Sequence, residues 1–171
     1  LNWELFKNYG FRTKKPDNLK RVHVLYNRFL LAADCYFIID MAWGIFYEHK
    51  EVSEFFPLIY SLTVFYFLFM LLTMLTWTKY IVAYIGTKGR RSIVLIYGVW
   101  TMFVIGLICL MLNCFYHFMF SYNSAHKYIG ETGRNISFLL QITFYIVISS
   151  YMIYVAHKSS GHKKIRYIAV T

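Results

Sequence analysis

The feature that most constrains the fold of this chain is an apolar run from Arg28 to Glu48 that contains two carboxylates, Asp34 and Asp40. Its apolar part, residues 29–47, has 19 residues, and a helix of that length covers about 28 Å, close to the roughly 30 Å of a bilayer's hydrocarbon core. An Asp near the centre of such a helix costs about 2.5–3.5 kcal/mol, whereas each Leu, Ile or Phe contributes only about 0.3–0.6 kcal/mol. We therefore expect a membrane-spanning helix that depends on neighbouring helices for polar partners.

Three further apolar runs follow, and together with the first they predict an all-α fold. With 58% hydrophobic and 21% aromatic residues, the chain is too apolar for an ordinary soluble domain. We predict a polytopic membrane protein, a four-transmembrane-helix bundle with spans at about residues 29–47, 55–78, 92–120 and 136–156. Residues typical of helix starts and breaks flank these runs, namely Ser53, Pro57, Gly86, Gly89 and Asn135.

The sequence outside the spans predicts two cytoplasmic flanks. We expect a juxtamembrane segment at residues 1–28, the transmembrane region at residues 29–156 and a basic tail at residues 157–171. The chain opens on Leu1 rather than Met, and its tail ends in the apolar stretch YIAVT. These ends favour a fragment whose tail continues into further sequence.

The distribution of Lys and Arg predicts the orientation in the membrane. Of the 18 Lys and Arg residues, 15 lie in residues 1–28, in the loop after the second span or in the tail, and the other three are Lys50, Lys127 and Arg134. By the positive-inside rule, both termini are cytoplasmic and the loops after the first and third spans face outward. We expect a multi-pass protein of the inner (plasma) membrane. This pattern accounts for the net charge of +10, so nucleic acid is not an expected partner.

Polar residues from three spans are predicted to share one depth. Counted from the outer boundary of each span, Asp40, Asn113 and Gln141 all lie about 9–11 Å below the outer surface, and Thr63 is nearly level with them. Asp34 lies deeper, about 20 Å from that side, and about 120° away from Asp40 around the helix. Two interpretations stay open. These residues form a buried site for a proton, an ion or a small polar ligand, or they hold the helices together by hydrogen bonds.

The sequence carries no motif of a known catalytic site. It has no nucleophile and base at a recognisable spacing, no phosphate-binding glycine loop and no metalloprotease motif. Cys114 and His117 are of ligand type at a helical spacing, but two candidate ligands make only a weak metal signal. We therefore expect no enzyme, no metal and no cofactor.

Two stretches resemble a known family. The stretch YNRFLLAADCYFIIDMAWGIFYEH, with Asn27 and Arg28 at its cytoplasmic edge and Asp40 within the span, resembles an early span of the multi-helix membrane input region of bacterial GGDEF-type diguanylate cyclases and related sensor histidine kinases, chiefly from Firmicutes. The stretch LNCFYHFMFSYNSAHKYIGETGR is similar to the same region. The resemblance implies the sensory part of a larger signalling protein with a catalytic output domain after the C-terminus. These residues themselves contain no GGDEF sequence, kinase His box or ATP-binding glycine motif.

We therefore expect a non-catalytic membrane sensor or anchoring region that passes a cue to a cytoplasmic output domain. Its expected partners are the lipid bilayer, that output domain and, as a further option, a second copy of the chain in a homodimer. One alternative is a stand-alone transporter or channel subunit that uses Asp34 and Asp40. Another is an assembly or scaffold protein without a ligand.

Overall fold

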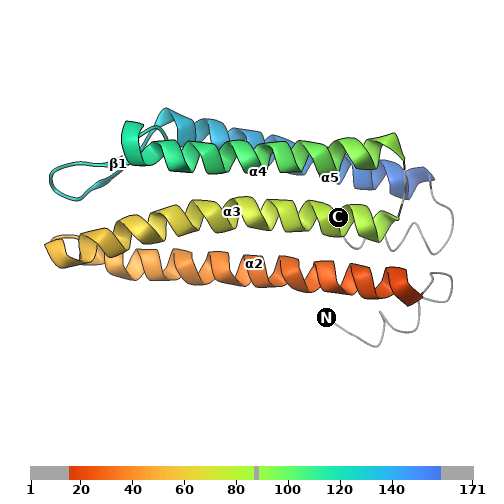
Figure 1. Ribbon diagram of the computed structural model, residues 1–171, viewed down its shortest axis with the longest axis horizontal. Helices are drawn as coiled ribbons and strands as arrows, with labels where there is room; N and C mark the ends of the chain where they lie inside the picture. Colours follow the sequence, from red (N-terminus) through yellow and green to blue (C-terminus); the bar gives the residue numbers. More distant parts are fainter. Residues whose placement is uncertain (1–15, 87–88, 159–171) are drawn as a thin grey trace.

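A computed structural model describes residues 16–86 and 89–158, which form a bundle of four long helices. The helices are α2 (Pro16–Glu48), α3 (Phe56–Ile85), α4 (Arg90–Tyr116) and α5 (Thr132–Lys158), and they run alternately up and down (Figure 1). Each is long and apolar enough to cross a membrane. The predicted fold class, an all-α four-helix bundle of a membrane protein, is confirmed.

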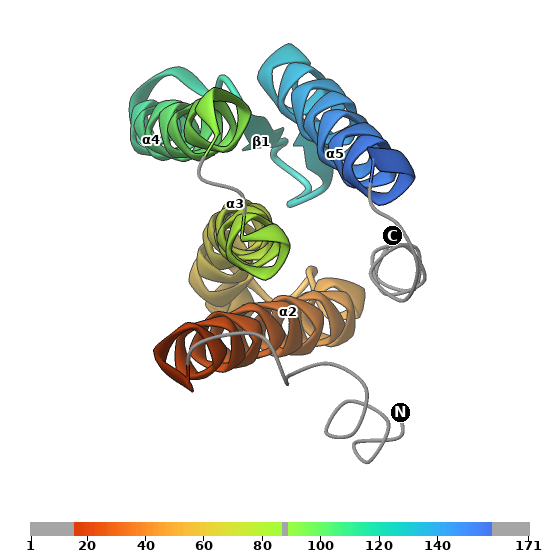
Figure 2. The same cartoon turned by 90° about the vertical axis from the view of Figure 1, so that its right-hand side faces the viewer.

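Helix α3 lies at the centre of the bundle. Viewed from one end, it separates α2 on one side from the pair α4 and α5 on the other (Figure 2). Eleven of its residues are buried, among them Phe67, Met74 and Ile81. Helix α2 packs mainly on α3, and Val22 and Ala32 are its buried apolar residues within residues 20–48. Most of the surface of α2 is therefore open to its surroundings.

Helices α3 and α4 approach each other closely at one glycine. A Cβ atom placed on Gly106 of α4 would lie 2.5 Å from Cδ1 of Leu71 on α3. Both residues are buried, and Leu71 is only 3% exposed. Small residues permit this kind of approach between membrane helices.

The helix boundaries differ from the predicted spans. Helix α2 begins at Pro16, so the second half of the predicted juxtamembrane segment is helical. Helix α3 continues past residue 78 to Ile85 and ends at Gly86, whose φ of 68° is readily adopted by glycine. Helix α5 begins at Thr132, so Asn135 is not the cap that the sequence suggested but lies in the first turn.

At the end of α4 the chain changes from helix to strand. The helix stops at Tyr116 instead of residue 120, because His117 adopts a left-handed conformation with φ 49°. The chain then forms a short antiparallel hairpin of β1 (Phe120–Tyr122) and β2 (Tyr128–Gly130), in which Ser121 pairs with Ile129. The loop between the third and fourth spans is therefore an ordered element at the end of the bundle (Figure 1).

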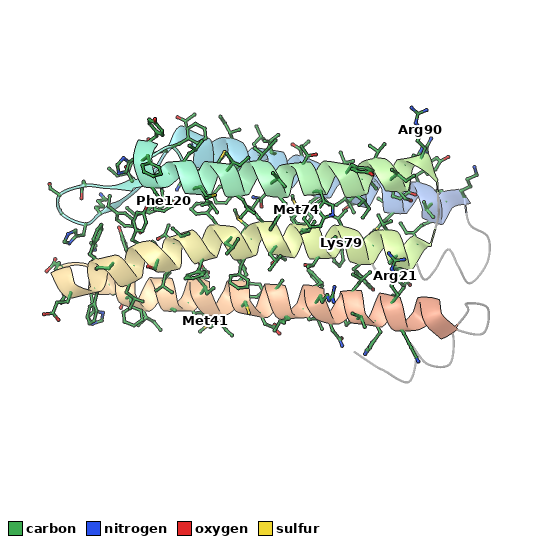
Figure 3. The ribbon with its side chains drawn as sticks, in the orientation of Figure 1. Arg21, Met41, Met74, Lys79, Arg90 and Phe120 are labelled. Atoms are coloured by element: carbon green, nitrogen blue, oxygen red, sulfur yellow. The ribbon has the colours of Figure 1, made fainter. Side chains whose placement is uncertain are left out.

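The two ends of the bundle carry different charges. The hairpin end carries Lys50, Lys127 and Arg134, whereas the opposite end carries most of the described cations, including Arg21, Lys79 and Arg90 (Figure 3). The alternation of the helices thus places the basic segments together, as the positive-inside rule requires. Which end faces the cytoplasm stays a prediction.

Candidate functional site

A pocket of about 200 Å³ lies near the hairpin end of the bundle. Helices α2, α3 and α5 and strand β2 all contribute to its wall. Its lining combines one carboxylate, one guanidinium, one hydroxyl and five aromatic side chains. These residues are Asp40, Trp43, Thr63, Tyr66, Phe67, Tyr128, Arg134 and Phe138.

Thr63 is the best-connected residue of the pocket wall. Its hydroxyl donates to the carbonyl oxygen of Ile59 at 2.9 Å and accepts a hydrogen bond from Nε1 of Trp43 at 2.9 Å. The hydroxyl of Tyr122 lies 2.6 Å from the same oxygen. Because a hydroxyl has one proton and two lone pairs, Tyr122 must be the donor in this contact. Thr63 thereby ties α2 and the hairpin to α3.

Asn113 at the end of α4 holds the base of the hairpin. Its Oδ1 accepts hydrogen bonds from the backbone N–H groups of Met119 (2.6 Å) and Phe120 (3.1 Å), and its Nδ2 donates to the carbonyl oxygen of Phe120 (3.1 Å). The side chain is 1% exposed. These three bonds pair backbone groups of Met119 and Phe120, just after the end of α4, that would otherwise be buried without a partner.

Aromatic packing fixes the rest of the hairpin over the pocket. Phe120 is fully buried and stacks on Phe67 with ring centroids 5.7 Å apart. The rings of Trp43 and Tyr128 pack in a T-shaped arrangement with their centroids 5.8 Å apart. The hydroxyl of Tyr47 accepts a hydrogen bond from the backbone N–H of Tyr128 at 3.1 Å. The hairpin therefore contacts both α2 and α3 at the pocket rim.

Arg134 lies over a glycine at the edge of the pocket. A Cβ atom on Gly130 would overlap Cζ of Arg134, so the guanidinium occupies the space that a larger residue would take. Its Cζ is 5.7 Å from the centroid of Tyr128 and 6.0 Å from that of Phe138, and its Nε and Nη2 donate to Oδ1 of Asn135. Burial raises the pKa of Tyr128, against the lowering effect of Arg134.

The structure separates the residues that the sequence grouped by depth. Asp40 lines the pocket, Asn113 binds the hairpin base, and Gln141 of α5 is buried with its Nε2 3.4 Å from Oγ of Ser137. Within residues 16–86 and 89–158, no hydrogen bond joins any two of these three. Thr63, which the depth estimate placed nearly level with them, does share the pocket with Asp40.

Asp34 lies outside the pocket on an exposed face of α2. In the part of the chain that the structure describes, neither Asp34 nor Asp40 has a hydrogen-bond partner. The predicted angle of about 120° between them explains why only one of the two reaches the pocket. The role of these carboxylates in binding a ligand or a proton stays a prediction.

Several pocket residues were not singled out from the sequence. Trp43 lies three residues after Asp40, so helical spacing alone places the two on neighbouring positions of one face. From the sequence, Arg134 is a loop charge and part of the stretch that resembles the membrane input region, together with Tyr128 and Gly130. Its place beside Tyr128 depends on the hairpin, which the sequence did not predict. Tyr66 and Phe138 lie in apolar runs and carried no distinct signal.

Comparison of this chain with protein-family models, with curated proteins and with solved structures finds no match. The pocket itself is therefore the feature from which a function can be inferred. A carboxylate and a guanidinium among aromatic rings, in a partly enclosed space, are features of sites that bind a small polar or amphipathic molecule.

Proposed function

We propose that this chain is the membrane-embedded sensory part of a signal-transduction protein in the plasma membrane, with both termini in the cytoplasm. It carries out no reaction itself and passes a cue to a cytoplasmic output domain. The observation that carries the proposal is the position of the pocket. Asp40 and Trp43 approach it from α2, and Arg134 and Phe138 approach it from α5, two helices that lie on opposite sides of α3 (Figure 2).

A ligand in this pocket would contact α2 and α5 together. A shift of one helix relative to the other changes those contacts, so the ligand has a different affinity for the two arrangements and moves their populations. Both α2 and α5 run from the pocket to the basic end of the bundle (Figure 1). Movement of α5 therefore reaches Lys158 directly, on the side that the positive-inside rule assigns to the cytoplasm.

A reporter fusion tests this proposal. A cytoplasmic output domain, joined in frame after Thr171, is compared in wild type, Asp40→Asn and Arg134→Gln in cells. Lys127→Gln is the matched control, because it also removes a hairpin-end cation but lies outside the pocket. We expect the two pocket variants to change the reporter output severalfold at unchanged membrane insertion, and the control to leave it unchanged. Equal output from all four proteins would contradict the proposal.

The transporter alternative is tested with the 171-residue chain alone. A transporter moves its substrate or a proton across proteoliposomes without any C-terminal extension, and loss of an intramembrane carboxylate abolishes that flux. We expect no flux above that of empty vesicles. Flux by the wild-type chain that disappears in Asp40→Asn would overturn the sensory proposal in favour of transport.

A further inference from the structure

The outward face of α2 carries a seven-residue repeat. Val24, Leu31, Ile38 and Ile45 form one row, each seven residues from the next. A second row lies three residues further along the helix and consists of Asn27, Asp34, Met41 and Glu48. Positions that alternate three and four residues apart are those of a two-helix coiled-coil seam. The first row is entirely apolar, whereas the second row is polar except at Met41. We call these eight residues the α2 seam.

The α2 seam is uncovered over its whole length. Leu31 and Ile38 are each 65% exposed, and Met41 is 69% exposed. Asn27, Asp34 and Glu48 are also exposed. Figure 3 shows Met41 on the side of α2 that faces away from the rest of the bundle. The seam runs for about 36 Å along the helix, enough to cross the hydrocarbon core.

Asp34 makes lipid an unsuitable neighbour for this face. It lies between Leu31 and Ile38 in the middle of the apolar stretch, with no hydrogen-bond partner among the described residues. A carboxyl group at this depth is costly unless it is paired, and such groups almost always face protein or a water-filled space. Lipid contact also imposes no seven-residue period, whereas packing against another helix does.

We infer that the α2 seam is the interface of a parallel homodimer, in which Asp34 of one copy faces Asp34 of the other. All copies insert in the same orientation, so a two-fold axis along the membrane normal places identical residues at identical depths. Asn27 then faces Asn27, and two such amides can donate to and accept from each other. Two Asp34 carboxyl groups that share one proton form a single hydrogen bond, in which the protonated group donates and the ionised group accepts. Because Nδ2 of Asn27 already lies 3.5 Å from Nε2 of His23, the residue that gains a new polar partner from a second copy is Asp34.

Disulfide cross-linking in proteoliposomes tests the interface. Single cysteines are placed at each position from 30 to 45 in a background in which Cys35, Cys109 and Cys114 are replaced by Ala. We expect dimer yield to peak at positions 31, 34, 38, 41 and 45 and to fall at least severalfold between them. Ile105→Cys on α4 is the matched control, since Ile105 is 54% exposed and lies outside the seam. A flat profile, peaks on another face of α2, or equal cross-linking at position 105 would overturn the inference.

Substitution of Asp34 tests the polar pair without any cysteine. From the usual strength of hydrogen bonds between membrane helices, we expect Asp34→Leu to lose dimer affinity by about threefold to tenfold. Energy transfer between labelled copies in bilayers measures this affinity. Asp34→Asn, which can still bond across the axis, should keep most of the affinity. Asp40→Leu removes the same group from another face of α2 and should leave the affinity unchanged. An unchanged affinity in Asp34→Leu, or an equal loss in Asp40→Leu, would contradict the role of Asp34.

Discussion

The hydroxyl groups of Thr63 and Tyr122, 59 residues apart in the chain, lie 2.6 Å from each other and join the central helix to the outer hairpin. Thr63 donates its own proton to Ile59 and also accepts from Trp43, so its hydrogen-bonding capacity is complete. Tyr122 can take part only as a donor, in its protonated form. The hydrogen bond that joins Thr63, in the pocket wall, to the hairpin therefore requires a protonated Tyr122.

This dependence predicts a loss of stability at high pH. Burial raises the pKa of Tyr122, so the folded state holds the phenolic proton more tightly than the unfolded state, whose Tyr pKa is about 10. The resulting contribution to stability is complete below about pH 10 and is lost as the pH rises through the folded pKa. Thermal unfolding in detergent should therefore show a falling melting temperature above about pH 10.

Tyr122→Phe separates this effect from general alkaline damage. We expect the variant to lose about 0.5–1.5 kcal/mol of stability at neutral pH, because the bond to Thr63 is removed, and to decline less steeply than wild type at high pH. Tyr116→Phe alters a tyrosine that is 77% exposed and serves as the control. Parallel pH profiles for wild type and Tyr122→Phe would contradict the assignment of Tyr122 as donor.

Asn113 provides the second prediction, on the stability of the hairpin. Asn113→Leu has a similar volume but leaves two N–H groups and one carbonyl oxygen without their partner in a buried place. Each such group costs about 1–3 kcal/mol. Gln141→Leu is the matched control, since among residues 16–86 and 89–158 this buried amide has only a long bond to Ser137. In thermal unfolding, Asn113→Leu should be the more destabilised by at least ~2 kcal/mol, and equal melting temperatures would exclude the anchoring role.

The four helices could be predicted from the sequence, whereas the site could be predicted only in part. Length and apolarity of the runs are sufficient to identify spans, because a bilayer requires every backbone group to be paired within a helix. The ends of the helices were predicted less accurately. In α4, for example, the apolar residues Phe118 to Phe120 follow the last helical residue, Tyr116. Strands of three residues are too short to show the alternation that identifies a strand.

Asp40, Asn113 and Gln141 have different surroundings in the structure, although their predicted depths match, for a geometrical reason. The predicted depth of Asn113 was counted back from residue 120 along a helix, but the last four residues of that count are not helical. Depth also says nothing about direction around the helix, and Asn113 and Gln141 each bond to residues near them in the chain. For Thr63 and Asp40 the depths were close and the faces happened to meet, so this pair lines one pocket.

The third prediction concerns the close approach of α3 and α4. Gly106→Ala should destabilise the bundle by about 1–3 kcal/mol, because the new methyl group overlaps Leu71 in a packed core. Gly44→Ala is the control: a Cβ at Gly44 has no neighbour within 4 Å, so this variant should be neutral or gain up to about 1 kcal/mol from helix propensity. Leu71→Ala alone should cost about 2–5 kcal/mol, because Leu71 is buried, and the double variant should lose less than the sum of the two single losses, because it no longer has the overlap. Thermal unfolding of wild type and these four variants in detergent measures this, and equal stability of the two glycine variants would contradict the close packing of Gly106 on Leu71.

The fourth prediction revises what is expected of Asp40. A hydrogen-bonded cluster with Asn113 and Gln141 would make Asp40→Asn better tolerated than Asp40→Leu. In the structure Asp40 is exposed and lines a pocket without a bonded partner among the described residues. We therefore expect the two variants to differ by less than about 0.5 kcal/mol in stability, as for substitutions away from packed or bonded positions. A melting temperature clearly lower for Asp40→Leu would show that Asp40 has a structural partner after all.

The last prediction concerns the orientation of the bundle. Ser124 lies exposed in the turn of the hairpin, whereas Thr87 lies in the sequence between α3 and α4, next to Lys88 and close to Arg90 and Arg91. If the basic end faces the cytoplasm, single cysteines at positions 53 and 124 should react with an impermeant thiol reagent on intact cells, in a background without native cysteines. A cysteine at position 87 should react only after the membrane is opened. Labelling at position 87 in intact cells, with protection at position 124, would invert the assigned orientation, and it would place the pocket on the cytoplasmic side, where it could not receive an external cue.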